Sequence, residues 1–154
     1  MQVNGYARLF EDKCIMENIK IKLTSKITQE DQSATFSRTG FGTIEQLDNG
    51  FRVNYQEENK NGNVPVKLLI KPKELVMQRG KIEDNDYTMM KFEPGEKKNC
   101  RIIAHSKIMD LTSVTNKLDF SGEIGENMQL NVEYDLFSGL YLVGNYAIKI
   151  DFYH

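Results

Sequence analysis

The sequence is poor in the residues that build metal centres and disulfide frameworks. Its 154 residues include two cysteines, two histidines and three prolines, and no tryptophan. Cys14 and Cys100 are too few and too far apart for a disulfide framework, so we expect free, partly buried thiols. His105 and His154 form no Cys/His cluster with the spacing of zinc ligands, so we expect no metal ion.

Long apolar runs and a strong charge of either sign are absent too. No stretch approaches the roughly 20 apolar residues of a membrane-spanning helix, and the charges from Arg8 to Lys13 interrupt the apolar core that a secretory signal needs. We therefore expect a cytoplasmic protein that binds no membrane. The net charge of −2 offers no clustered basic surface for nucleic acid. The short basic spots at 71–73 and 96–98 are predicted to be solvated loop tips.

The sequence does contain a succession of short runs in which apolar and polar residues alternate, separated by turn residues. This pattern is typical of antiparallel strands, and no long segment has the period of a helix. The clearest run lies at 128–136. We predict an all-β fold, an antiparallel up-and-down β-barrel of eight to ten strands, as a single domain over 17–154. Residues 1–16 are predicted to be an N-terminal extension that forms a short helix or an arm.

Several stretches indicate where the chain turns or bends. Asp48-Asn49-Gly50 predicts a hairpin because Asn and Gly accept positive φ at low cost. The segment EENKNGN at 57–63 predicts a second hairpin. Gly40 and Gly42 interrupt a strand pattern and predict a bulge or a sharp bend within one long strand. The region 100–118 contains two strand-like pieces without a turn signal between them, which indicates one bent strand or a bulge.

Enzyme motifs are lacking. Glu57 and Glu58 are neighbours in a strand and should point to opposite faces, which does not suit two carboxylates that share one reacting atom. His105 has no glycine-framed serine or reactive cysteine nearby in the sequence, so a hydrolase triad is not indicated. The Gly-x-Gly at 40–42 lies within a strand pattern and does not open a helix, so it is no dinucleotide fingerprint. We expect a protein without catalytic residues or a cofactor.

Five short motifs occur in the order and spacing of a known family: TGFG at 39–42, YQEE at 55–58, LVMQRG at 75–80, MKFEPGE at 90–96 and LNVEYDL at 130–136. In these motifs the chain, from about Glu17 to its end, resembles the YwiB-like family of bacterial proteins, a domain of unknown function. The resemblance implies a fold similar to the calycins, which are closed antiparallel barrels related in shape to lipocalins. It implies no established activity.

Two charged residues share strand faces with apolar ones, since Arg79 alternates in phase with Met77, and Glu57 with Val53 and Tyr55. A charge inside a barrel is costly unless it is paired or meets a ligand, and an eight-strand barrel can hold one small molecule. We therefore predict that Arg79 meets the head group of a small apolar or amphipathic anionic ligand. The residues predicted to bind it are Arg79, Glu57, Tyr55, Met77 and Tyr134, and the apolar wall is predicted from Phe51, Tyr55, Met77, Leu130, Val132 and Tyr134.

The alternative is a filled barrel that serves as a non-catalytic protein–protein interaction or structural module. In that case Arg79 reaches solvent at the barrel mouth or pairs with Glu57 for structural reasons only. The apolar turn FSGLYL at 137–142 is unusual, because turns are normally polar, and it indicates either a cap on the barrel mouth or a contact surface. The sequence leaves the oligomeric state and the identity of any ligand open.

Overall fold

The computed structural model of the chain describes residues 16–154, which form one closed antiparallel barrel of ten strands. The strands follow one another round the barrel in chain order, and β1 closes the ring by pairing with β10. The predicted all-β up-and-down barrel is thereby confirmed. The elements are β1 (Met16–Gln29), β2 (Gln32–Leu47), β3 (Gly50–Glu57), β4 (Val64–Lys71), β5 (Glu74–Lys81), the 3₁₀ turn η1 (Ile82–Asp84), β6 (Asp86–Phe92), β7 (Lys97–Ala104), β8 (Lys107–Ser121), β9 (Met128–Ser138) and β10 (Tyr141–Tyr153).

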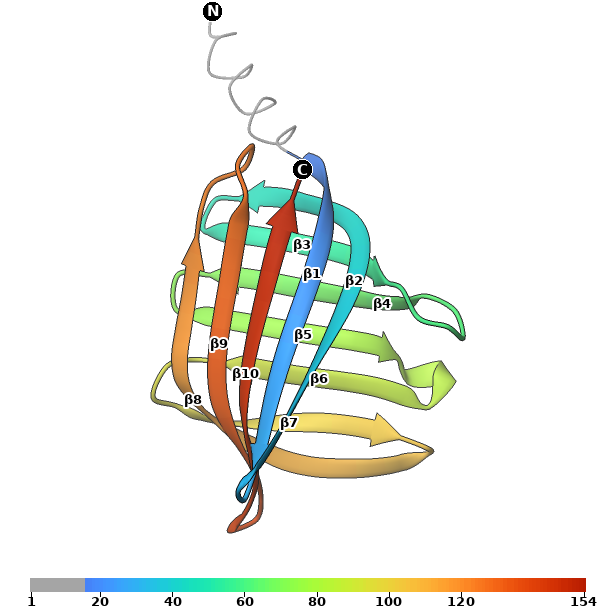
Figure 1. Cartoon of the computed structure of the whole chain (residues 1–154), viewed down its shortest axis with the longest axis vertical. Helices are drawn as coiled ribbons and strands as arrows, with labels where there is room; N and C mark the ends of the chain where they lie inside the picture. The colour runs from blue at the N-terminus through green and yellow to red at the C-terminus, as the bar shows by residue number, and fades with distance from the viewer. Residues whose placement is uncertain (1–15) are drawn as a thin grey trace, which may run out of the picture.

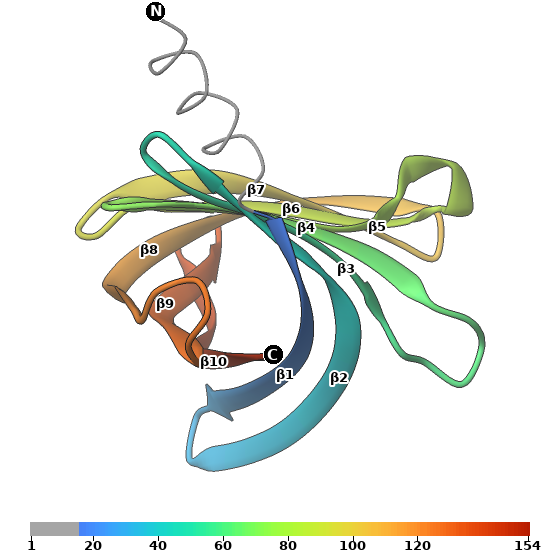
Figure 2. The same cartoon turned by 90° about the horizontal axis from the view of Figure 1, so that it is seen from above.

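The barrel is flattened into two layers whose strands cross at a steep angle. Strands β3 to β7 run across the molecule in Figure 1, whereas β1, β9 and β10 run along its long axis. Seen from above, the first group forms one layer and the second curves beneath it (Figure 2). The two longest strands, β2 with 16 residues and β8 with 15, bend from one layer into the other and so make the two corners of the barrel.

Glycines make the corner in β2. Gly40 and Gly42 lie opposite Glu57 and Tyr55 of β3, without a register shift, so the predicted sharp bend is present and the alternative of a bulge is not. A Cβ atom on Gly42 would lie 2.0 Å from the carbonyl oxygen of Asn54, and one on Gly40 would lie 2.5 Å from that of Gln56. Only glycine therefore lets β2 fold this closely over β3.

The corner in β8 is made differently. Its pairing with β9 shifts register between Thr115 and Lys117, which leaves Asn116 as an extra residue. Such a β-bulge bends a strand and increases its local twist. The corner is braced from the other side, because the amide of Gly95 in the β6–β7 connection donates a 2.8 Å hydrogen bond to the carbonyl oxygen of Thr115.

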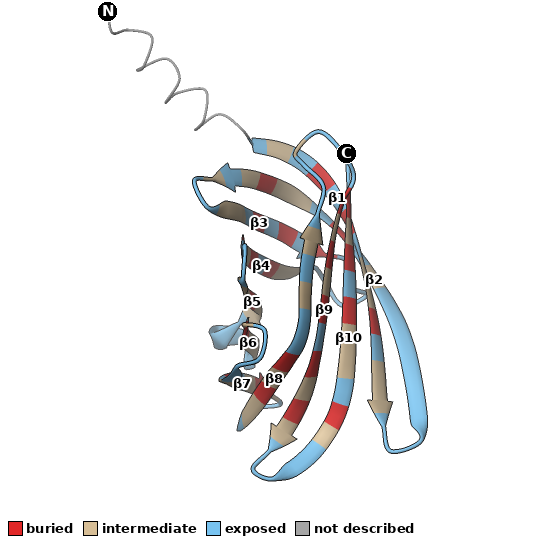
Figure 3. Ribbon diagram, turned by 90° about the vertical axis from the view of Figure 1, so that its left-hand side faces the viewer, coloured by how far each residue is buried: buried red, intermediate tan, exposed pale blue. Residues whose placement is uncertain are grey.

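The core lies between the two layers and is built from inward side chains of the strands. The glycine-rich strand β2 contributes a single fully buried apolar side chain, that of Ile44. Buried and exposed residues alternate along the strands (Figure 3), as the period of two predicted. The largest fully buried side chains are Phe92, Phe152, Ile44, Leu68, Leu75, Met128, Leu130, Ile150, Glu57, Val53, Val132 and Thr115.

Two local predictions were wrong. Residues 100–118 are neither one bent strand nor a bulge at this point, because β7 and β8 are joined by a tight turn at His105 and Ser106. Both turn residues have positive φ, 51° and 66°, as in the two-residue hairpins that usually carry Asn-Gly. The basic spot at 96–98 is no loop tip either, since Lys97 and Lys98 begin β7.

The predicted extension over 1–16 lies outside the described residues, apart from Met16, which begins β1. Between residues 16 and 154, no helix has both the length and the apolar character needed to cross a bilayer.

The close approach of β2 and β3 predicts the effect of adding one methyl group. We expect Gly42→Ala to lower the free energy of unfolding by about 2–3 kcal/mol, because the new Cβ would meet backbone atoms that cannot rotate away. The neighbouring Thr43→Ala, on the opposite face of β2, should cost less than about 1 kcal/mol. Urea denaturation of both variants measures the difference, and equal stabilities would contradict the bend described here.

Candidate functional site

One fully buried carboxylate is bound by two arginines at the corner of β2. Glu57, the last residue of β3, is 2% exposed. Its carboxylate accepts hydrogen bonds from Nε of Arg79 at 3.2 Å and from Nη2 at 2.5 Å, a bidentate pair. Arg38 of β2 adds a third contact, with its Nε 3.8 Å from Oε2 of Glu57. Arg79 and Glu57, which were both predicted to face inward, thus pair with each other.

The position of this cluster follows from the corner. Pairing between β2 and β3 ends at Gly40 and Glu57, and beyond that point β2 pairs with β1 alone. Arg38 lies just outside the region where β2 pairs with β3, two residues before Gly40 and on the same face of β2. Its side chain is 39% exposed and that of Arg79 is 28% exposed, so both guanidinium groups reach solvent although the carboxylate does not.

The cluster carries a surplus positive charge, because two guanidinium groups share one carboxylate. Hydrogen bonding to Glu57 raises the pKa of Arg79 further, so this residue stays charged. Within residues 16–154 Arg38 forms no ion pair other than that with Glu57. Its Cζ atom lies 5.1 Å from the centroid of the Phe36 ring, a cation–π contact that holds it against an apolar surface.

Sequence reasoning missed Arg38. The signal was present, because Arg38 shares the parity of Gly40 and Gly42, which face the barrel interior. Its meeting with Glu57 depends on the pairing of β2 with β3 and on the bend at the glycines, and neither register can be read from local alternation.

The structure brings only part of the predicted site together. Tyr55 lies beside Glu57 and Arg79, and its burial, together with the charge of Glu57, raises its pKa. Met77 is a buried core residue of β5. Tyr134 belongs to a different group, since its ring stacks on that of Tyr146 at 5.0 Å and packs against Phe92 at 4.8 Å.

The predicted apolar wall is part of one continuous core. Tyr55, Met77, Leu130, Val132 and Tyr134 are all buried in the main cluster, and Phe51 packs against it. Burial also raises the pKa of Tyr134. These side chains pack on one another in the interior.

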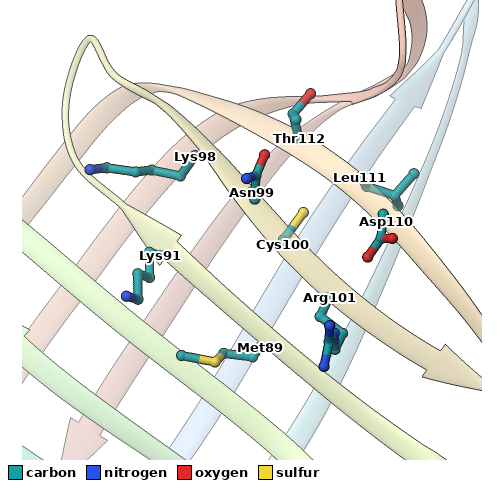
Figure 4. Close-up of a pocket in the computed structure, with 9 residues that line it drawn as sticks. All are labelled: Met89, Lys91, Lys98, Asn99, Cys100, Arg101, Asp110, Leu111 and Thr112. Atoms are coloured by element: carbon teal, nitrogen blue, oxygen red, sulfur yellow. The ribbon is translucent and has the colours of Figure 1, made fainter.

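A separate cavity of about 710 Å³ is lined by residues of β6, β7 and β8, outside the predicted site. Its lining is drawn in Figure 4 and comprises Met89, Lys91, Lys98, Asn99, Cys100, Arg101, Asp110, Leu111 and Thr112. Cys100 is a free, buried thiol, and burial raises its pKa to about 11. It is therefore protonated near neutral pH and is no nucleophile.

From residue 16 onward, no group of three or more His, Cys, Asp or Glu side chains is placed to hold a metal ion. His105 is exposed in the β7–β8 turn. Glu58 is exposed and accepts a hydrogen bond from the Thr39 hydroxyl, whereas Glu57 is buried, so the two acids do face opposite sides.

The apolar turn at 137–142 joins β9 to β10 and stands in solvent. Leu140 is 100% exposed, and Tyr141 and Leu142 are exposed as well. These three exposed side chains do not cap the barrel as one of the two predicted roles required, and the role of contact surface stays a prediction.

Comparison with known proteins identifies a family and a fold. The profile of a family described as "Domain of unknown function (DUF1934)" matches residues 21–150. The crystal structure of the ywiB protein from Bacillus subtilis is similar, with a TM-score of 0.76 and 15% sequence identity over 90% of this chain and 92% of that one. At this identity the likeness concerns the fold alone. The search of curated proteins found no match.

The buried carboxylate predicts a large effect of a small substitution. We expect Glu57→Gln to lower the free energy of unfolding by about 2–3 kcal/mol, because it leaves two guanidinium groups without their counter-ion, although both retain some solvent. Glu45→Gln removes the partner of Arg52 from an exposed pair and should cost less than about 1 kcal/mol. Similar losses in chemical denaturation would show that the Glu57 cluster contributes no more than a surface pair.

The buried thiol predicts a pH dependence. Burial raises the pKa of Cys100 from 9.0 to about 11, and only the thiolate reacts with iodoacetamide. In a Cys14→Ser background at about pH 8, we therefore expect alkylation of the folded protein to be about 100-fold slower than in denaturant, from the thiolate fractions alone. The folded-state rate should keep rising from pH 9 to about 11. A rate that levels off near pH 9 would contradict this assignment.

Proposed function

The chain belongs to this DUF1934 family of domains of unknown function, and we propose that its barrel binds a small amphipathic anion at the corner where Arg38 and Arg79 lie. The observation that carries the proposal is the unequal burial of the charges. The only carboxylate in the cluster is 2% exposed, while the guanidinium groups of Arg79 and Arg38 are 28% and 39% exposed. The surplus positive charge therefore faces solvent, and the negative charge does not.

The two arginines differ in what they can offer an incoming acid. Arg79 uses Nε and Nη2 on Glu57, so it is held rigidly and has Nη1 left for a ligand. Arg38 touches Glu57 through Nε alone, which leaves both terminal nitrogens, a fork that matches a carboxylate or phosphate group. A rigid and a more open guanidinium side by side suit one acidic head group.

An apolar surface adjoins this charge. Phe36, which is 39% exposed and lies beside Arg38, and the buried Tyr55 flank the cluster on β2 and β3. An apolar body attached to the acid would rest against Phe36 and remove it from water, which is favourable in proportion to the area covered. This is the reason for proposing an amphipathic anion over a simple inorganic one.

A second candidate function is supported by the β9–β10 turn. Full exposure of Leu140, with Tyr141 and Leu142 beside it, is characteristic of surfaces that contact another protein. The continuous core supports the same candidate, because a filled barrel needs no ligand. In that case the Glu57 cluster would be structural only. Both candidates are non-catalytic functions that we propose for a bacterial protein of the cytoplasm.

The deciding experiment is native mass spectrometry of protein purified gently from its own host, followed by denaturing extraction of what is bound. We expect a small organic acid in stoichiometric amount. Arg38→Gln should weaken its binding by about tenfold or more, from the loss of charge-assisted hydrogen bonds. Arg38 is preferable to Arg79 for this test, because its removal spares the bidentate pair with Glu57.

The matched control is Arg52→Gln, which removes an exposed arginine of β3 whose partner is Glu45, and it should retain the ligand. An empty protein that also shows no rise in melting temperature with a panel of fatty acids and anionic metabolites would overturn the proposal. Loss of the ligand in both variants would locate it elsewhere.

A further inference from the structure

Strands β6 and β7 pair over only part of their length. The ladder joins Tyr87, Thr88 and Met89 to Ile103, Ile102 and Arg101, and then stops. Beyond it β6 continues through Met90–Phe92, still paired with β5, while the first half of β7 is paired with β8. Each of these stretches therefore has one side without a strand partner, and the two sides face each other across a gap in the wall.

The gap is a slot closed at both ends. The β6–β7 ladder ends it at Met89 and Arg101. At the other end the connection between the strands is fastened to β8 through the hydrogen bond from Gly95 to Thr115, and to β7 through an ion pair of 3.0 Å between Glu93 and Lys98. An extended peptide cannot run through such a slot as an added strand, whereas a small molecule can enter from the side. The cavity of about 710 Å³ is of the size that small-molecule sites have.

The lining of this slot is basic, although the whole chain has a net charge of −2. Lys91, Lys98 and Arg101 contribute three positive charges and Asp110 one negative charge. Lys98 is neutralised by Glu93. In the part of the chain that the structure describes, Lys91 and Arg101 form no ion pair, even though Arg101 lies directly opposite Asp110 in the β7–β8 register. Two cations from two diverging strands are thus uncommitted.

The rest of the lining divides into polar and apolar parts. Figure 4 shows Met89 and Lys91 on β6, with Arg101 across from Met89 on β7, where the ladder between the two strands ends. Asn99 adds an amide, and the unpaired strand edges carry backbone N–H groups of the kind that bind anions at some sheet edges. Met89 and Leu111 supply apolar surface.

We propose that the slot between β6 and β7 binds a small molecule with a phosphate monoester group, its phosphate between Lys91 and Arg101 and its organic part against Met89 and Leu111. A phosphate monoester carries nearly two negative charges at neutral pH, which suits the two uncommitted cations Lys91 and Arg101 against the single acid Asp110, and arginine binds phosphate oxygens in bidentate fashion. None of Arg38, Glu57 or Arg79 lines the slot, so this site is independent of the one proposed above.

The test is a titration of ¹⁵N-labelled protein with phenyl phosphate, which joins an apolar ring to the phosphate, with phenol as the uncharged control. We expect saturable shifts of backbone amide signals confined to 89–91, 98–101 and 110–112, and no response to phenol. Saturable shifts centred on other residues, or none at all, would overturn the proposal.

Substitution then assigns the charges. Lys91→Gln with Arg101→Gln should raise the dissociation constant about 100-fold, tenfold for each lost charge-assisted contact. The matched control is Arg52→Gln with Lys117→Gln, which removes two exposed cations on β3 and β8 and should leave the constant unchanged. Melting curves check that all variants fold, and each single variant is titrated if the double variant does not. Equal constants in the test and control variants would overturn the assignment.

A further arm separates a soluble phosphate ester from a lipid head group of the same chemistry. Sedimentation with phosphatidic acid vesicles should recover no protein, because the slot is recessed between strands. Recovery with vesicles together with no response to phenyl phosphate would overturn the small-molecule assignment.

Discussion

Closing ten strands into a flattened barrel requires strands that leave one layer and enter the other, and both candidate sites lie where this happens. A strand that turns a corner parts from one neighbour, and backbone and side chains at the parting lose the partners they would have in a continuous sheet. At the corner of β2 the parting exposes Arg38 beside Glu57. At the corner of β8 the β6–β7 connection is fastened to Thr115, and β6 and β7 separate.

Away from the corners the interior is apolar and closely packed, which confines polar chemistry to its margins. Four polar side chains of the described residues are nevertheless buried, Ser25, Glu57, Ser113 and Thr115, and Glu57 alone among them carries a charge. Arg79 makes this tolerable by meeting both carboxylate oxygens, since a buried charge without such partners would be strongly unfavourable. Because Arg79 holds both carboxylate oxygens, most of the N–H donors of Arg38 stay free. The buried acid therefore has a basic surface beside it.

Local alternation was enough to predict the strands, their inward faces and even the interior positions of Glu57 and Arg79, because side-chain direction in a strand depends only on parity. It was not enough at the β7–β8 turn, where His105 and Ser106 adopt positive φ without the Asn or Gly that normally signals it. The role of Arg38 and the β6–β7 slot were not predicted from the sequence for another reason. Both depend on where two strands stop pairing, which is a property of register and corners that no single stretch of sequence contains.

Chain order round the ring also determines when the barrel can be completed. Nine of the ten ladders join strands that are consecutive in the sequence and can form as local hairpins, whereas the ladder of β1 with β10 joins the two ends of the described chain, Lys20 to Tyr153. During synthesis β1 must therefore wait as an open edge until the last strand has left the ribosome. Lys20, Lys22 and Lys26 lie exposed along that edge, and lysines of this kind discourage pairing with foreign strands. In the finished barrel these lysines are ordinary surface residues. They protect the β1 edge only during the time before β10 pairs with it.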